Sequence, residues 1–133
     1  SAKLLSGCTL AASAPRASLS DPDAAREFAR QAVALDRDEI AAQFTLGGLL
    51  VDGEPHAFLE WRRTLPAKAD ESPEIWYLRG LWARKAGDLP VAARCFWEAA
   101  RRSPQHRLAH YQLGLVLAQI GDPSADAFQQ HSK

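Results

Sequence analysis

The chain has 133 residues, which is enough for a single domain that buries about two-thirds of its unfolded surface. Its 16 basic residues balance its 16 acidic residues, so a nucleic-acid or anionic-membrane surface is not expected, because such surfaces depend on net positive charge. No apolar run approaches the roughly 20 residues of a membrane-spanning helix, and the sequence therefore predicts no direct membrane insertion.

Residues 1–20 allow two interpretations. In the favoured one, residues 2–13 form the first helix of an opening helix pair. In the other, residues 5–8 form a lipobox, at which a signal peptide is cut and Cys8 is lipidated. Only seven residues precede Cys8, too few for the apolar region of a signal peptide. A lipid anchor at Cys8 is therefore the minor alternative.

A helix is predicted over residues 21–35. Asp21 is a suitable N-cap, and Pro22 suits the first helical position. Apolar residues recur at helical spacing and predict a buried face, made of Ala24, Phe28, Ala32 and Leu35. The residues expected to face water are Arg26, Glu27, Arg30 and Gln31.

The next helix pair is predicted over residues 40–51 and 55–65, with a link over residues 66–72 before the following pair. Two glycines, Gly47 and Gly48, fall inside the first of these helices. Ala57 and Trp61 are the residues of the second helix expected to pack against it.

The most regular stretch runs from residue 73 to residue 104, where two apolar-periodic runs flank a Gly-Asp break. Ser72 and Pro73 give the first helix an N-cap and a first-turn proline. Gly87 suits the left-handed conformation that follows a helix end. Asp88 can then cap the second helix.

Small and large residues alternate in this stretch in a way that predicts close packing. Gly80 and Ala99 are small, as expected where two helices cross at short distance. Trp76 and Phe96 are large, as expected where the adjacent space must be filled. Trp82 and Trp97 either form an apolar surface patch or fill space beside a neighbouring helix.

A last helix is predicted over residues 105–120, and Asp122 with Pro123 begins a short further helix that ends at residues 131–133. Gly53, Gly87 and Gly121 are spaced 34 residues apart. A constant spacing of this size is typical of a repeat architecture.

The central stretch resembles one tetratricopeptide (TPR) repeat. The residues that carry the resemblance are Trp76, Tyr77, Gly80, Gly87, Ala92, Phe96, Ala99 and Pro104, and the one departure is Arg79, where the family usually has leucine. The resemblance implies an all-α, right-handed TPR-type solenoid of about four helix-turn-helix pairs, the last incomplete. Its repeats fall at about residues 2–35, 38–69, 73–104 and 107–131, within a single domain over residues 1–133 that is compatible with an excerpt from a longer chain.

No catalytic constellation is present in the sequence, which contains no nucleophile-elbow, phosphate-loop or dinucleotide-binding motif. We therefore expect no enzyme activity and no cofactor. His106 and His110 can share a helix face, but two ligands are too few to predict a metal site. The arginine pairs at residues 62–63 and 101–102 are interpreted as solvated helix ends.

The resemblance also implies that one face of each first helix lines a concave groove. The partner-binding residues that it selects are Phe44, Tyr77, Leu81, Arg84, Lys85, Tyr111, Leu115 and Gln119. The three aromatic residues occupy equivalent positions and either bind a ligand as a ladder or simply pack. Arg84 and Lys85 are expected to pair with acidic groups of the ligand.

The implied function is a non-enzymatic, bacterial-type TPR scaffold for protein–protein interaction, which binds a peptide or helix of a partner in the concave groove. One alternative is a structural repeat module of a larger assembly or multidomain protein, which makes contacts, self-association included, through its ends and convex face. A second alternative is a lipidated bacterial envelope assembly factor. The sequence does not determine the compartment, cytoplasmic or periplasmic.

Overall fold

The computed structural model describes residues 21–121, and this part of the chain is helical with no strand. The expectation of an all-α protein is confirmed for these residues. The helices are α3 (Pro22–Leu35), α4 (Ile40–Leu50), α5 (Pro55–Arg63), the 3₁₀ helix η1 (Ala67–Glu71), α6 (Pro73–Lys85), α7 (Leu89–Arg102) and α8 (Arg107–Gly121). None of them is long and apolar enough to cross a membrane. The helices expected over residues 2–13 and after residue 122 lie outside the described residues.

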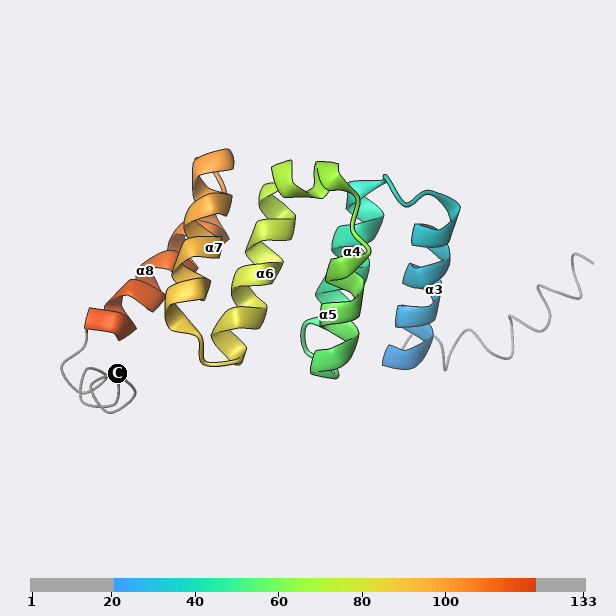
Figure 1. Cartoon of the computed structure of the whole chain (residues 1–133), viewed down its shortest axis with the longest axis horizontal. Coiled ribbons are helices and arrows are strands. Elements are labelled where there is room, and N and C mark those ends of the chain that lie inside the picture. The colour runs from blue at the N-terminus through green and yellow to red at the C-terminus, as the bar shows by residue number, and fades with distance from the viewer. Residues whose placement is uncertain (1–20, 122–133) are drawn as a thin grey trace, which may run out of the picture.

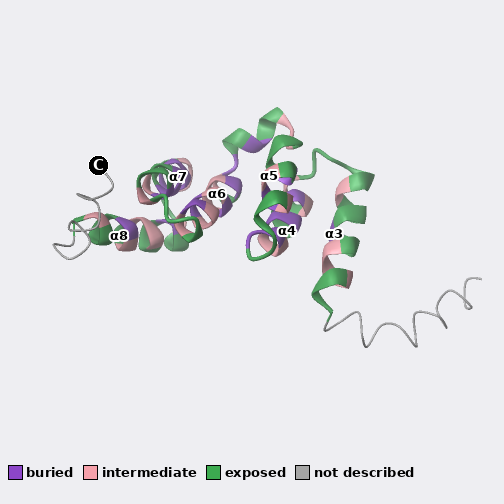
Figure 2. Ribbon diagram, turned by 60° about the horizontal axis from the view of Figure 1, so that its bottom comes forward, coloured by how far each residue is buried: buried purple, intermediate pink, exposed green. Residues whose placement is uncertain are grey.

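The helices stand side by side along the long axis of the molecule, and the chain reverses direction at each connection (Figure 1). Helix α4 packs against α3, α5 and α6, and α7 packs against both α6 and α8. In Figure 2, α5 lies above α4 and α7 lies above α8. Each helix thus contacts helices that are near it in sequence. The contact between α4 and α6 joins the helices α3 to α5 to the helices α6 to α8.

The helix boundaries follow the predicted capping residues. The Ser72 hydroxyl accepts the backbone N–H of Ile75 at 3.3 Å, at the start of α6. The Asp88 carboxylate accepts the N–H of Val91 at 3.3 Å, at the start of α7. Gly87, between them, has a φ of 83°. Ser72 and Asp88 thus bond backbone N–H groups that have no partner within their helices, and Gly87 adopts a backbone conformation that favours glycine.

Two glycines let aromatic rings approach the backbone closely, as predicted for Gly80. A Cβ atom built on Gly80 lies 2.6 Å from Cε1 of Phe96, and one built on Gly47 lies 2.3 Å from Cη2 of Trp61. Both rings are buried. Helices α6 and α7 therefore meet through the same glycine–aromatic contact as α4 and α5.

A buried hydrogen-bonded chain holds Trp61 in this position. The indole Nε1 donates to Oε1 of Gln43 at 2.9 Å, and the Gln43 amide donates to the backbone oxygen of Arg37 at 2.9 Å. Gln43 is buried, so these bonds satisfy polar groups that would otherwise be costly to remove from water. They also tie the loop before α4 to α5.

The predicted buried face of α3 is wrong. Ala29 is the buried residue of this helix and Val33 packs beside it, whereas Phe28 is 61% exposed and Leu35 is 88% exposed. The helix carries apolar residues on two adjacent faces, and only the face with Ala29 and Val33 packs on α4. Figure 2 shows that exposed residues predominate on α3.

Trp82 packs inside the fold and does not form a surface patch with Trp97. Its ring stacks on Phe58 at a centroid distance of 5.5 Å and an interplanar angle of 6°. Trp97 is about half exposed on α7. Of the two interpretations of Trp82, the filling of space beside a neighbouring helix is the correct one.

Glu98 on α7 is a buried carboxylate surrounded by three arginines. Arg102 donates a hydrogen bond to the Glu98 carboxylate, and the Nε atom of Arg94 donates another at 2.9 Å. The Nη2 atom of Arg101 lies 3.0 Å from a carboxylate oxygen of Glu98, whose side chain is buried. Hydrogen bonds from Arg102 and then Arg94 lower the pKa of Glu98 to about 2. All four residues lie on α7, so the cluster follows from helical spacing.

Because folding lowers the pKa of Glu98, the protein is expected to lose stability in acid. The contribution of Glu98 is present above about pH 4.5, the ordinary value of such a group, and is lost as the pH falls toward 2. Thermal unfolding between pH 7 and pH 2.5 measures this loss. Glu98→Gln should flatten the profile below pH 4.5 and lower the melting temperature at pH 7.

The matched control for this prediction is Glu60→Gln. Glu60 pairs with Arg63 at 3.0 Å on the exposed surface of α5, where an ion pair contributes little. This variant should keep the wild-type pH profile. Identical profiles for wild type and Glu98→Gln would contradict the role given to the cluster.

Candidate partner-binding surface

Three of the predicted binding residues come together in one cavity. Leu81, Arg84 and Lys85 of α6 line a cavity of about 310 Å³. The other lining residues are Val51 and Asp52, directly after α4. Residues three and four apart share a face of a helix, and α6 packs against α4. The cavity therefore combines an apolar wall with two cations and one acid.

The two cations of this cavity have different partners. The Lys85 Nζ atom lies 2.5 Å from Oδ1 of Asp52, and both side chains are exposed. Exposed pairs of this kind contribute about 0–1 kcal/mol, so an acidic group of a ligand can replace Asp52 at little cost. The Arg84 Nη1 atom donates to Oε1 of Gln112 at 2.5 Å. Gln112 is an uncharged amide, so this bond brings no negative charge to balance that of Arg84.

The Tyr77 ring packs against two other rings. Its ring centroid lies 5.7 Å from that of Phe96 and 5.1 Å from that of His106. Burial raises the pKa of the Tyr77 hydroxyl. The Tyr77 ring is therefore half-buried against α7 and the residue before α8. Phe44 and Tyr111, the other aromatic residues of the predicted ladder, are exposed.

The predicted residues on α8 lie on its open side. Tyr111 is 63% exposed, Gln119 is exposed and Leu115 is half-buried. A Cβ atom built on Gly114 meets no atom of residues 21–121 within 4 Å, in contrast to Gly47 and Gly80. Within the described part of the chain, this side of α8 is therefore exposed apolar surface next to the Arg84–Gln112 bond.

Both histidines near α8 bond to the backbone. The Nδ1 atom of His106 accepts the N–H of Ala109 at 3.1 Å, which caps the first turn of the helix. The Nε2 atom of His110 lies 2.8 Å from the backbone oxygen of Pro104. In residues 21–121 no three side chains of metal-ligating type cluster.

Gln112 is a site residue that sequence reasoning missed. It joins α8 to α6 through Arg84, across 28 residues of sequence, and no local motif signals such a pairing. The sequence signal that could have indicated Gln112 is its position directly after Tyr111, a predicted binding residue.

Comparison of this chain with protein-family models, curated proteins and solved structures found no match.

Proposed function

We propose that this chain is a non-enzymatic TPR-type scaffold, folded as a right-handed solenoid, which binds an extended peptide or helix of a protein partner. In this proposal α4, α6 and α8 are the first helices of successive repeats, and α5 and α7 are second helices. The binding surface consists of the cavity lined by Leu81, Arg84 and Lys85 and the exposed side of α8 at Tyr111.

The repeated glycine–aromatic contact supports the repeat architecture. Gly47 with Trp61 and Gly80 with Phe96 make the same close approach in consecutive helix pairs. Repeat proteins stack one supersecondary unit on the next, so the same contact is expected to recur in each unit. The residue that matches these glycines in the next unit is Gly114.

The observation that carries the function is the composition of the cavity between α4 and α6. It offers an apolar side chain beside Arg84 and Lys85, and the acid that partners Lys85 is exposed and weakly held. Such a surface suits a peptide that places an acidic residue next to an apolar one, because charge-assisted hydrogen bonds are strong and directional. Tyr111 adds an aromatic group with a polar tip, a type common at protein interfaces.

Selection from a random peptide library on the wild-type protein tests the proposal. We expect the selected peptides to be enriched in aspartate or glutamate next to an apolar residue. Arg84→Ala should weaken their binding at least about tenfold, the effect of losing a hydrogen bond to a charged group. Isothermal titration calorimetry measures both dissociation constants.

The control variant is Arg30→Ala. Arg30 is exposed on α3 and does not line the cavity of Leu81 and Arg84. Arg30→Ala therefore lowers the net charge by the same amount as Arg84→Ala but leaves the proposed surface unchanged. Selected peptides should bind this variant as they bind wild type. Equal weakening by both variants, or peptides without acidic residues, would contradict the proposal.

A further inference from the structure

Arg79 stands at a position where the other proposed first helices have leucine. The residue directly before the glycine of each proposed first helix is Leu46 in α4 and Leu113 in α8, but Arg79 in α6. Leu46 is buried and Leu113 packs against a core cluster. The Arg79 side chain is only 17% exposed. A charged group therefore occupies a position at which the neighbouring units carry a core leucine.

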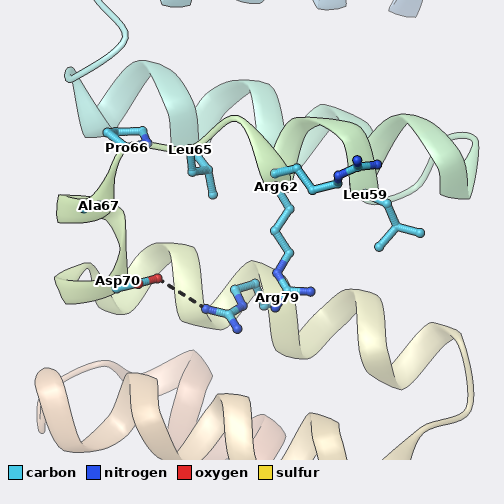
Figure 3. Close-up of a pocket in the computed structure, with 8 residues that line it drawn as sticks. Leu59, Arg62, Leu65, Pro66, Ala67, Asp70 and Arg79 are labelled. Atoms are coloured by element: carbon cyan, nitrogen blue, oxygen red, sulfur yellow. Dashed lines mark ion pairs between the residues drawn. The ribbon is translucent and has the colours of Figure 1, made fainter.

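A cavity of about 550 Å³ lies beside Arg79, between α5, η1 and α6 (Figure 3). Its volume falls in the range of roughly 300–1,000 Å³ that is usual for ligand sites. Apolar side chains of α5 and of the link after it form one wall, namely Leu59, Leu65, Pro66 and Ala67. The charged lining consists of three arginines and one aspartate, Arg62, Arg63, Arg79 and Asp70.

The guanidinium of Arg79 is held in one orientation. Its Cζ atom lies 3.8 Å from the centroid of the Trp76 ring, and its Nη1 atom lies 3.7 Å from Oδ1 of Asp70. Trp76 is itself fixed, since its Nε1 donates to the backbone oxygen of Asp70 at 2.7 Å. Stacking on an aromatic ring occupies the face of the guanidinium, so a ligand would meet its terminal Nη–H groups, and the fixed orientation reduces the freedom lost on binding.

Two unfavourable features coincide at this site. The Nε atom of Arg79 is buried and has no hydrogen-bond partner in the part of the chain that the structure describes. Arg62 reaches from α5 toward Arg79 (Figure 3), and burial, together with the charge of Arg62, lowers the pKa of Arg79. An unsatisfied buried donor and a like-charged neighbour both carry a free-energy cost. An anion bound between the two arginines would offset the repulsion between their charges.

We propose that this cavity binds an oxyanion group, a carboxylate or a phosphate, of an acidic peptide, with Arg79 and Arg62 as the ligating residues. The Nη–H groups of Arg79 and the exposed guanidinium of Arg62 can each donate to an oxygen of such a group. The apolar side chains of α5 and of the link after it, across the cavity from Arg79, receive the chain that flanks the oxyanion (Figure 3).

This site is distinct from the surface proposed above. Arg79 is two residues from both Tyr77 and Leu81, which corresponds to about 200° around the helix. It therefore faces α5 and η1, while Leu81 faces the end of α4. The inference does not depend on peptide binding at Arg84, because no residue lines both cavities.

Titration of the labelled protein with inorganic phosphate and, separately, with succinate tests the inference by NMR at constant ionic strength. The wild-type resonances of the Arg79 Nε–H and the Trp76 indole N–H should shift saturably. Arg79→Leu and Arg62→Gln should each raise the dissociation constant at least tenfold, with Trp76 as the reporter. Arg79→Leu should melt at or above the wild-type temperature, because leucine occupies the matching positions of α4 and α8.

Arg107→Gln is the control, since it removes one charge from an exposed position on α8 and should leave anion binding unchanged. Tighter binding of phosphate than of succinate would identify a phosphorylated residue as the source of the oxyanion, and similar binding would identify aspartate or glutamate. Absence of a saturable shift in the wild type, or equal affinity in all variants, would overturn the inference. Arg62 is exposed on α5, so its variant remains informative even if Arg79→Leu fails to fold.

Discussion

Phe96→Ala is expected to lower the free energy of unfolding by about 3–5 kcal/mol, the usual cost of truncating a buried aromatic residue. The Phe96 side chain is fully buried where α7 meets α6. It contacts the Tyr77 ring and the backbone at Gly80. Removal of the ring leaves a cavity between the two helices that backbone movement can only partly close. Urea unfolding followed by circular dichroism measures the change.

Val91→Ala is the matched control, because Val91 lies on the same helix with its side chain about half exposed. Its truncation should change stability by only about 0.5 kcal/mol. A loss below about 1.5 kcal/mol for Phe96→Ala would contradict its place as a core residue.

Gly80→Ala is expected to destabilise the protein by about 1–3 kcal/mol, the typical cost of an overpacked core. The added Cβ atom would lie 2.6 Å from Cε1 of Phe96. That ring is itself packed against Tyr77 at 5.7 Å, so it cannot move without disturbing α6 or α7. Chemical denaturation with the same probe gives the difference directly.

Gly114→Ala serves as the internal comparison, because Gly114 holds the same position in its helix but, among the residues that the structure describes, none has an atom within 4 Å of an added Cβ. Here alanine should stabilise the protein by about 0.5–1 kcal/mol, as it does in the interior of an uncrowded helix. Opposite signs at the two glycines are the expected result. Destabilisation of similar size at both would mean that another helix covers α8 at Gly114.

The features predicted correctly from sequence are those set by neighbouring residues. Ser72, Asp88 and Gly87 act within one or two turns of their own positions, so their roles can be recognised without the fold. Close packing at Gly80 was also predicted, because a small residue inside a helix indicates a close crossing, and the structure shows Phe96 as the residue that fills the space there. The face of α3 was not, since Phe28 and Ala29 are adjacent and only the position of α4 decides which is covered.

The candidate site was predicted in part. The resemblance to the repeat family selects Leu81, Arg84 and Lys85 as binding residues, and the structure places these three residues in one cavity. Their partners in α4 and α8 come from distant sequence, so the Arg84–Gln112 bond had no local signal. The Arg79 cavity was likewise missed, although the arginine in place of a leucine was visible in the sequence.

The most direct test of the proposed function is an NMR map of the amide resonances that shift when a selected acidic peptide is added. The proposed binding mode predicts shifts at the end of α4, along the exposed side of α6 at Leu81, Arg84 and Lys85, and on α8 at Tyr111, with Arg84→Ala abolishing most of them. Shifts concentrated on α5 and α7, unaffected by Arg84→Ala, would contradict it.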